Sequence, residues 1–217
     1  MAKKHIRYKC QQCGRTTHRE MGKCPQCGQW NTMIAEMVTE KTNNINKSIV
    51  GSSLPSSKPR PINEIETTTT DRLALPNDEF ARVLGGGIVP GSMVLIGGDP
   101  GIGKSTLMLQ IATSMAKTNL PVLYVSGEES AHQVKMRATR LDDWSQSNTN
   151  HLYLLTETNL EKITEHILST KAQLVIIDSI QTITSDDLDS SPGSITQVSN
   201  CTNLLTQLAK MSDVAIF

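Results

Sequence analysis

Short apolar runs alternate with stretches of helical periodicity from about residue 80 to the end of the chain. Apolar strands joined through helices are typical of a parallel sheet that is covered on both faces. The sequence therefore predicts an α/β domain. Its expected strands are residues 93–97, 122–126, 151–155 and 174–178, and a last one that begins within 213–217.

Apolar residues at helical spacing predict the helices that connect these strands. One helix is expected over about 104–117, directly after a glycine-rich loop. The others are marked by apolar residues that would share one helix face. These residues are Val134, Ala138 and Leu141, then Leu160, Ile163 and Ile167, and finally Val198, Cys201, Leu205 and Leu208.

The first 70 residues differ from this pattern. Residues 1–34 are rich in Cys, Lys and Arg, whereas residues 39–70 are mostly Ser, Thr, Asn, Pro and Lys without periodicity. Such a polar stretch is typical of a linker. We therefore expect a small module over 1–34, a flexible linker over 35–70 and the α/β domain over 71–217.

Composition suits a soluble globular protein, which we expect to stay in the cytoplasm. Aromatic residues make up only 3% of the 217 residues, so aliphatic side chains and methionine must build the core. No apolar run approaches the roughly 18 residues that span a bilayer, which excludes a transmembrane class. The charged N-terminus is followed by no apolar stretch, so a secretory signal is not expected and the thiols should stay reduced.

A net charge of zero hides an asymmetry along the chain. Residues 1–31 hold seven lysines and arginines against one acidic residue, Glu20, and the rest of the chain carries the opposite balance. A basic module on an acidic body suits contact with nucleic acid. A merely solubilising terminus explains the same charge equally well, so charge alone leaves DNA contact open.

The cysteines of the N-terminal module are spaced as two CxxC pairs. Cys10 and Cys13 form one pair, and Cys24 and Cys27 form the other. Two such turns supply the four tetrahedral thiolates of a structural zinc site, with no open position for catalysis. Disulfides, chance and an iron–sulfur cluster are the alternatives. Cys201 lies apart from these pairs and is expected to be a core residue.

The stretch GDPGIGKS, residues 98–105, matches the phosphate-binding pattern GxxxxGK[ST] between a predicted strand and a predicted helix. Its glycines allow backbone N–H groups to converge on the phosphates of ATP at a helix N-terminus. Lys104 would neutralise the β- and γ-phosphates, and the Ser105 hydroxyl would bind Mg²⁺. The expected nucleotide-binding residues are Gly98, Asp99, Pro100, Gly101, Ile102, Gly103, Lys104, Ser105 and Thr106.

Acidic residues follow two of the predicted strands. Asp178 ends the run LVIID and is expected to hold Mg²⁺, although an aspartate there also suits a helix cap. Glu128 and Glu129 follow the run VLYVS, at an edge where open α/β sheets bind ligands. We expect Glu128 to activate the attacking water, with Glu129 as the alternate. Both glutamates could otherwise serve only the following helix N-terminus.

Several motifs together resemble the bacterial RadA (Sms) family of DNA-repair ATPases, within the RecA-like group. They are RVLGGGIVPGS from Arg82, GGDPGIGKSTL, YVSGEES and LVIIDSIQT, behind a cysteine module ending in CPQCGQWNT. The resemblance implies a RecA-like P-loop ATPase core behind a Cys₄ zinc ribbon. It implies ATP hydrolysis coupled to single-stranded or branched DNA, and a role in recombinational repair and branch migration. Ring-shaped homo-oligomers and a partner recombinase of the RecA type are implied as well.

This chain departs from the family pattern at several places. Glu20 stands where the family usually has a tryptophan, Ala81 where an aspartate is common, and the usual pattern before Phe80 is missing. The family also continues beyond the point that corresponds to Phe217, with further core strands and a Lon-protease-like domain. We therefore expect this chain to be a fragment with an incomplete ATPase domain and no DNA-stimulated turnover alone.

Two other functions remain compatible with the motifs. A RecA-like signalling ATPase of the KaiC type shares the LGGG…PG pattern and the paired glutamates. A chain that binds nucleotide and zinc without turnover, as an interaction module, is the third possibility.

Overall fold

The computed structural model describes residues 4–17, 19–39, 59, 61–64, 72–141 and 150–217. The chain divides into two compact units, residues 1–69 and 70–217, which are considered separately below.

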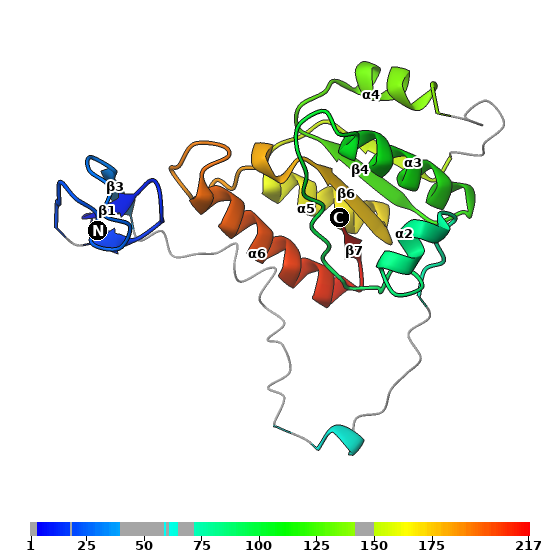
Figure 1. Ribbon diagram of the computed structural model, residues 1–217, viewed down its shortest axis with the longest axis horizontal. Coiled ribbons are helices and arrows are strands. Elements are labelled where there is room, and N and C mark those ends of the chain that lie inside the picture. The colour runs from blue at the N-terminus through cyan, green and yellow to red at the C-terminus, as the bar shows by residue number, and fades with distance from the viewer. Residues whose placement is uncertain (1–3, 18, 40–58, 60, 65–71, 142–149) are drawn as a thin grey trace. The chain divides into compact units, whose positions relative to one another are not determined.

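The first unit is built on a small antiparallel sheet (Figure 1). Strand β1 (Lys4–Cys10) lies between β2 (Thr16–Thr17) and β3 (Met33–Thr39). Residues 35–39, expected in the linker, instead form most of β3 because they pair with β1 along its length. Most of the remaining predicted linker lies outside the described residues, apart from the short 3₁₀ helix η1 (Ile62–Glu64) and two single positions.

The second unit contains a parallel sheet in the order β5-β4-β6-β7, which confirms the predicted α/β class. Its strands are β4 (Val122–Ser126), β5 (Leu152–Leu155), β6 (Leu174–Asp178) and β7 (Ala215–Ile216). Strand β4 is buried throughout, whereas Tyr153 and Leu154 of β5 are exposed because β5 lies at the edge of the sheet.

Helices cover both faces of this sheet (Figure 1). Because successive strand side chains point to opposite faces, Tyr124 packs into the core beneath α3 (Lys104–Lys117), while Val125 packs into the core of α5 and α6. Helix α5 spans Leu160–Thr170 and α6 spans Ile195–Ser212. Full burial of each such side chain contributes roughly 1.5–3 kcal/mol.

The observed helices agree closely with the predicted ones. Helix α3 has the predicted bounds, and the predicted apolar faces of α5 and α6 are buried or half-buried. Helix α4 (Ala131–Ala138) ends early, so Leu141 lies beyond it, half-buried against the same core. Within the described ranges, no helix combines the length and the apolar character needed to cross a membrane.

A short helix that the apolar pattern did not reveal precedes the glycine-rich stretch. Helix α2 (Asp78–Val83) begins after Asn77, whose side chain accepts a 2.8 Å hydrogen bond from the Phe80 N–H. The Phe80 ring meets the Phe217 ring edge to face, with their centroids 5.9 Å apart. This contact ties α2 to the residue that follows β7.

The segment 93–97 was predicted as a buried strand, and that prediction is wrong. Only Met93 forms a bridge, with Ile216, and the Val94 N–H donates to the Ile216 carbonyl at 2.9 Å. Residues 94–97 form no further β-bridge in the described part of the chain, and Leu95 is 83% exposed.

The loop between β6 and α6 is held by one buried amide. The Gln197 side chain donates to the carbonyls of Leu188 and Ser190 at 3.1 Å and accepts from the Ser185 N–H at 3.1 Å. Gln197 is 1% exposed, so these bonds satisfy an otherwise costly buried amide. The loop is therefore attached to the first turn of α6.

Candidate nucleotide and metal sites

The predicted phosphate loop lies at the N-terminus of α3, as the motif requires. Gly101 and Gly103 adopt φ angles of +79° and +102°, in the left-handed region that favours glycine. Gly103 is the N-cap of α3, so the first backbone N–H groups of the helix lie beside the loop. Residues 97–103 are exposed, which leaves this anion-binding backbone accessible.

Lys104 folds back over this loop. Its ammonium donates to the carbonyl oxygens of Gly98 at 2.7 Å and Asp99 at 2.8 Å. A lysine ammonium carries three protons, so a third remains for a phosphate oxygen. The lysine thus fixes the loop and presents positive charge at the same point.

The structure brings Ser105 and Asp178 together from positions 73 residues apart. The Ser105 hydroxyl donates to Asp178 Oδ1 at 2.9 Å. A hydroxyl and a carboxylate are the hard oxygen ligands that Mg²⁺ takes in phosphate-transfer sites. The donor set therefore fits a magnesium ion, which Ser105 and Asp178 would hold.

Two residues that the sequence did not single out support Asp178. Tyr124, 1% exposed, donates from its phenol to Asp178 Oδ2 at 2.6 Å. Burial and the Asp178 carboxylate raise the pKa of Tyr124, so the phenol keeps its proton. The Arg137 guanidinium lies 3.7 Å from the same Oδ2 and 3.4 Å from the phenol oxygen.

The two glutamates after β4 have different partners. Glu128 is exposed, and its Oε1 accepts a 2.8 Å hydrogen bond from the Ser179 hydroxyl, at the end of the neighbouring strand. Glu129 is half-buried, and its Oε2 lies 2.9 Å from the Arg137 guanidinium. One glutamate therefore faces solvent beside Asp178, and the other forms an ion pair.

Gly127 holds the ends of β4 and β6 close together. Its N–H donates to the Asp178 carbonyl at 3.0 Å. A Cβ atom at this position would overlap the Thr182 hydroxyl, so only glycine fits. The sequence motif contained this glycine, but nothing in it pointed to the Thr182 contact.

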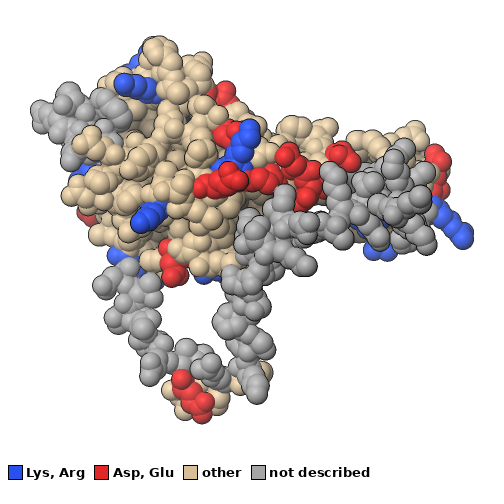
Figure 2. All heavy atoms as spheres, turned by 180° about the vertical axis from the view of Figure 1, so that it is seen from behind, with Lys and Arg blue, Asp and Glu red and all other residues tan. Residues whose placement is uncertain are grey.

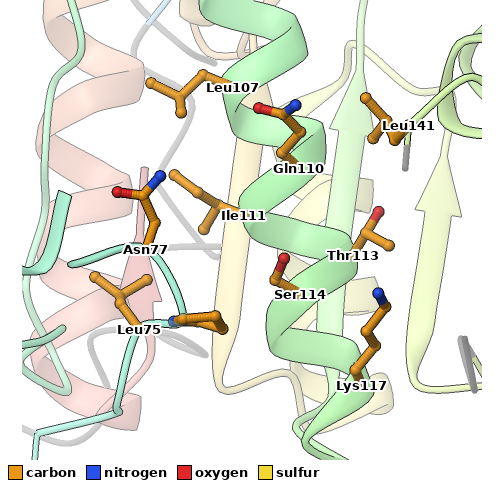
Figure 3. A pocket seen from close by; sticks show the side chains of 10 residues that line it. Leu75, Asn77, Leu107, Gln110, Ile111, Thr113, Ser114, Lys117 and Leu141 are labelled. Atoms are coloured by element: carbon orange, nitrogen blue, oxygen red, sulfur yellow. The ribbon is translucent and has the colours of Figure 1, made fainter. Parts of the chain in front are cut away.

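Two of the cavities that border helix α3 can be compared as nucleotide sites. One of about 200 Å³ is lined mainly by apolar side chains, together with Lys104, Asp178, Ser179 and Thr202, and it adjoins the phosphate loop. The other, of about 310 Å³, runs along α3 between Asn77 and Leu141 (Figure 3). It contains none of the residues predicted to bind phosphate, whereas the first cavity is lined by Lys104 and Asp178.

The two cysteine pairs of the first unit form matching turns. The N–H of Gly14 donates to the Cys10 carbonyl at 2.9 Å, and the N–H of Gly28 donates to the Cys24 carbonyl at 2.9 Å. Both glycines have positive φ, +73° and +70°. Each turn therefore points its two thiols to the same side.

All four predicted sulfur ligands, from Cys10, Cys13, Cys24 and Cys27, lie within 4.8 Å of one another. Two of the separations are 3.6 Å and 3.5 Å. Four Zn–S bonds of about 2.3 Å in a tetrahedron place sulfurs about 3.8 Å apart, so the cluster fits zinc. Desolvation opposes ionisation of Cys10, but a hydrogen bond with Thr32 and backbone N–H groups lower its pKa to about 6.

The fifth cysteine, Cys201, does not belong to the cluster of predicted zinc ligands. Cys201 is buried on α6, and desolvation raises its pKa to about 11. The thiol is thus neutral, as expected of a core residue.

Each of the two units matches the model of a known protein family. Residues 58–216 match the model of the AAA domain family, and this chain belongs to that family. Residues 8–35 match a model described as rubredoxin metal binding domain, which accords with the Cys₄ ribbon.

Over its full length the chain is 48% identical to DNA repair protein RadA of Halalkalibacterium halodurans and 46% identical to that of Bacillus subtilis. The corresponding protein of Listeria monocytogenes is 46% identical over 216 residues. These comparisons confirm the predicted RadA resemblance. The chain spans 46% of the length of each of these relatives.

Proposed function

We propose that this chain carries the ATP-hydrolysing core of a DNA-repair ATPase whose turnover is coupled to single-stranded or branched DNA. The observation that carries the proposal is the 2.9 Å contact between Ser105 and Asp178 beside the phosphate loop. It unites the two oxygen groups that P-loop ATPases use for Mg²⁺. The names of the RadA relatives supply the link to DNA repair.

Each residue of the site has a distinct role in this proposal. The backbone N–H groups of residues 98–99 and 101–106 and the Lys104 ammonium bind the ATP phosphates. Ser105 and Asp178 would hold Mg²⁺, which when bound neutralises charge on the β- and γ-phosphates.

Glu128 is the proposed general base. It is exposed at a strand end, and the Ser179 hydroxyl orients its carboxylate. Glu129, the alternate, is engaged with Arg137, which leaves it less free to accept a proton from water. These contacts support Glu128, because a general base must reach the attacking water.

The wider biological role follows from the resemblance to RadA. We propose branch migration and processing of recombination intermediates in the cytoplasm, together with a recombinase of the RecA type. A ring homo-oligomer is proposed as the working state, with ATP at the subunit interfaces.

ATPase assays with and without single-stranded DNA test this function. They are made on this chain and on the longer Bacillus subtilis relative. We expect the relative's turnover to rise with DNA, and this chain to bind nucleotide weakly without DNA-stimulated turnover. Turnover in the relative that DNA does not change would favour a signalling ATPase of the KaiC type. Nucleotide binding without turnover in either protein would favour an interaction module.

A further inference from the structure

An exposed tryptophan lies on the surface of the zinc ribbon. Trp30 is 68% exposed, although tryptophan is among the side chains most strongly removed from water on average. Its backbone pairs with Lys23, which fixes the position of the residue three places after the last cysteine ligand. The ring is therefore exposed on a turn that follows directly after the cysteine cluster.

A cation lies over this ring. The Lys23 ammonium is 5.5 Å from the ring centroid, within the range of a cation–π contact. Gly22 adds no side chain beside the ring, and an added Cβ there would come within 3.8 Å of the indole. The indole is thus oriented by its neighbours while most of its surface stays open.

The unit that carries Trp30 is basic. Arg7, Arg15 and Arg19 are exposed on the same unit, where Glu20 is the one acid among side chains described from 7 to 35. A zinc ion with four thiolates contributes a charge of about −2, which leaves residues 1–31 positive. The second unit differs, because acidic side chains form a band across one of its faces (Figure 2).

We propose that the surface formed by Trp30 and Lys23 binds single-stranded nucleic acid, with an unpaired base stacked on the indole and Lys23 near a phosphate. Aromatic faces next to basic side chains are how proteins bind single strands without sequence preference. The inference rests on the proposed function, which supplies the DNA, and adds that the ribbon itself makes contact.

Trp30 fluorescence provides a direct test. The chain has one other tryptophan, Trp144, so the Trp144→Phe variant makes Trp30 the only indole emitter. A thymidine oligonucleotide is titrated into the zinc-loaded variant, beside an abasic strand of equal length. We expect quenching by the thymidine strand and little quenching by the abasic one, because only bases stack.

Substitutions separate stacking from charge. Trp30→Ala should weaken oligonucleotide binding at least about fivefold, while Trp30→Phe keeps a ring and most of the affinity. Lys23→Ala should lower the slope of log affinity against log salt by about 0.7, and Trp30→Ala should leave the slope unchanged. Ile34→Ala, another exposed apolar residue of the ribbon, is the matched control. Zinc content is measured in every variant.

Unquenched emission, or equal affinity of the parent and zinc-loaded Trp30→Ala, would overturn the inference and assign the exposed ring to a protein partner. Equal quenching by the abasic strand would overturn the stacking step. Failure of the proposed function is distinct: it shows as ATP turnover in the Bacillus subtilis relative that single-stranded DNA does not alter.

Discussion

The phenol of Tyr124 donates to Asp178 Oδ2 at 2.6 Å, while Ser105 donates to Oδ1 of the same carboxylate at 2.9 Å. Both carboxylate oxygens of Asp178 therefore accept a hydrogen bond, one from the neighbouring strand β4 and one from the first turn of α3. These two hydrogen bonds orient the carboxylate before any ion binds, and such supporting contacts tune the affinity of metal sites.

Replacement of Tyr124 by phenylalanine tests this support. Loss of this hydrogen bond to the Asp178 carboxylate should raise the Mg²⁺ concentration needed for half-maximal nucleotide binding about 10- to 100-fold. Mg²⁺ is titrated at fixed concentration of a fluorescent ATP analogue. Tyr153→Phe, which alters an exposed phenol on β5, is the control. An unchanged Mg²⁺ midpoint in Tyr124→Phe would show that the bond is only structural.

Lys104→Ala tests the phosphate loop. Removal of a charged donor to phosphate should weaken ATP binding tenfold or more, and hydrolysis should vanish in the Bacillus subtilis relative carrying the equivalent change. The melting temperature without nucleotide should change little, because the buried strands are untouched. Wild-type affinity in this variant would refute the loop assignment.

Matched amide substitutions distinguish the roles of Glu128 and Glu129. Glu128→Gln should keep ATP binding and reduce hydrolysis about 10²- to 10⁴-fold, as expected for loss of a general base. Glu129→Gln should mainly weaken the partly exposed ion pair with Arg137. Turnover is measured in the Bacillus subtilis relative at the corresponding positions. The opposite pattern would make Glu129 the base.

Much of this architecture could be predicted from short motifs, because the interactions that form them join residues close together in the sequence. The glycine loop and the helix Lys104–Lys117 could be predicted from residues that are adjacent in the sequence. The metal-binding cluster could likewise be predicted from the spacing within each cysteine pair. Tyr124 was missed because the single polar atom in an apolar strand gives no sign of its partner, which lies 54 residues away. The strand predicted at 93–97 failed for a related reason, since pairing depends on a neighbour that sequence periodicity does not reveal.

Gly127 should tolerate no side chain. Gly127→Ala forces a Cβ into Thr182, and such overpacking typically costs about 1–3 kcal/mol of unfolding free energy. Gly97→Ala is the control, because a Cβ there meets nothing within 4 Å. Both are compared by denaturant unfolding. Equal stability of the two variants would mean that the ends of β4 and β6 separate easily.

Metal removal should act on one unit alone. Structural zinc contributes about 10–16 kcal/mol to folding in finger peptides, so chelation should unfold residues 8–30 and leave the second unit folded. Hydrogen exchange read separately over each unit checks this. Elemental analysis should give one zinc per chain. A Cys10→Ser variant that holds stoichiometric zinc would contradict the four-thiolate site.

The buried amide of Gln197 has a mechanical consequence. Because one side chain on α6 holds backbone groups of Ser185, Leu188 and Ser190, the loop after β6 cannot shift without its helix. A displacement of residues 185–190 would therefore require the first turn of α6 to move as well, and α6 leads along the chain to β7.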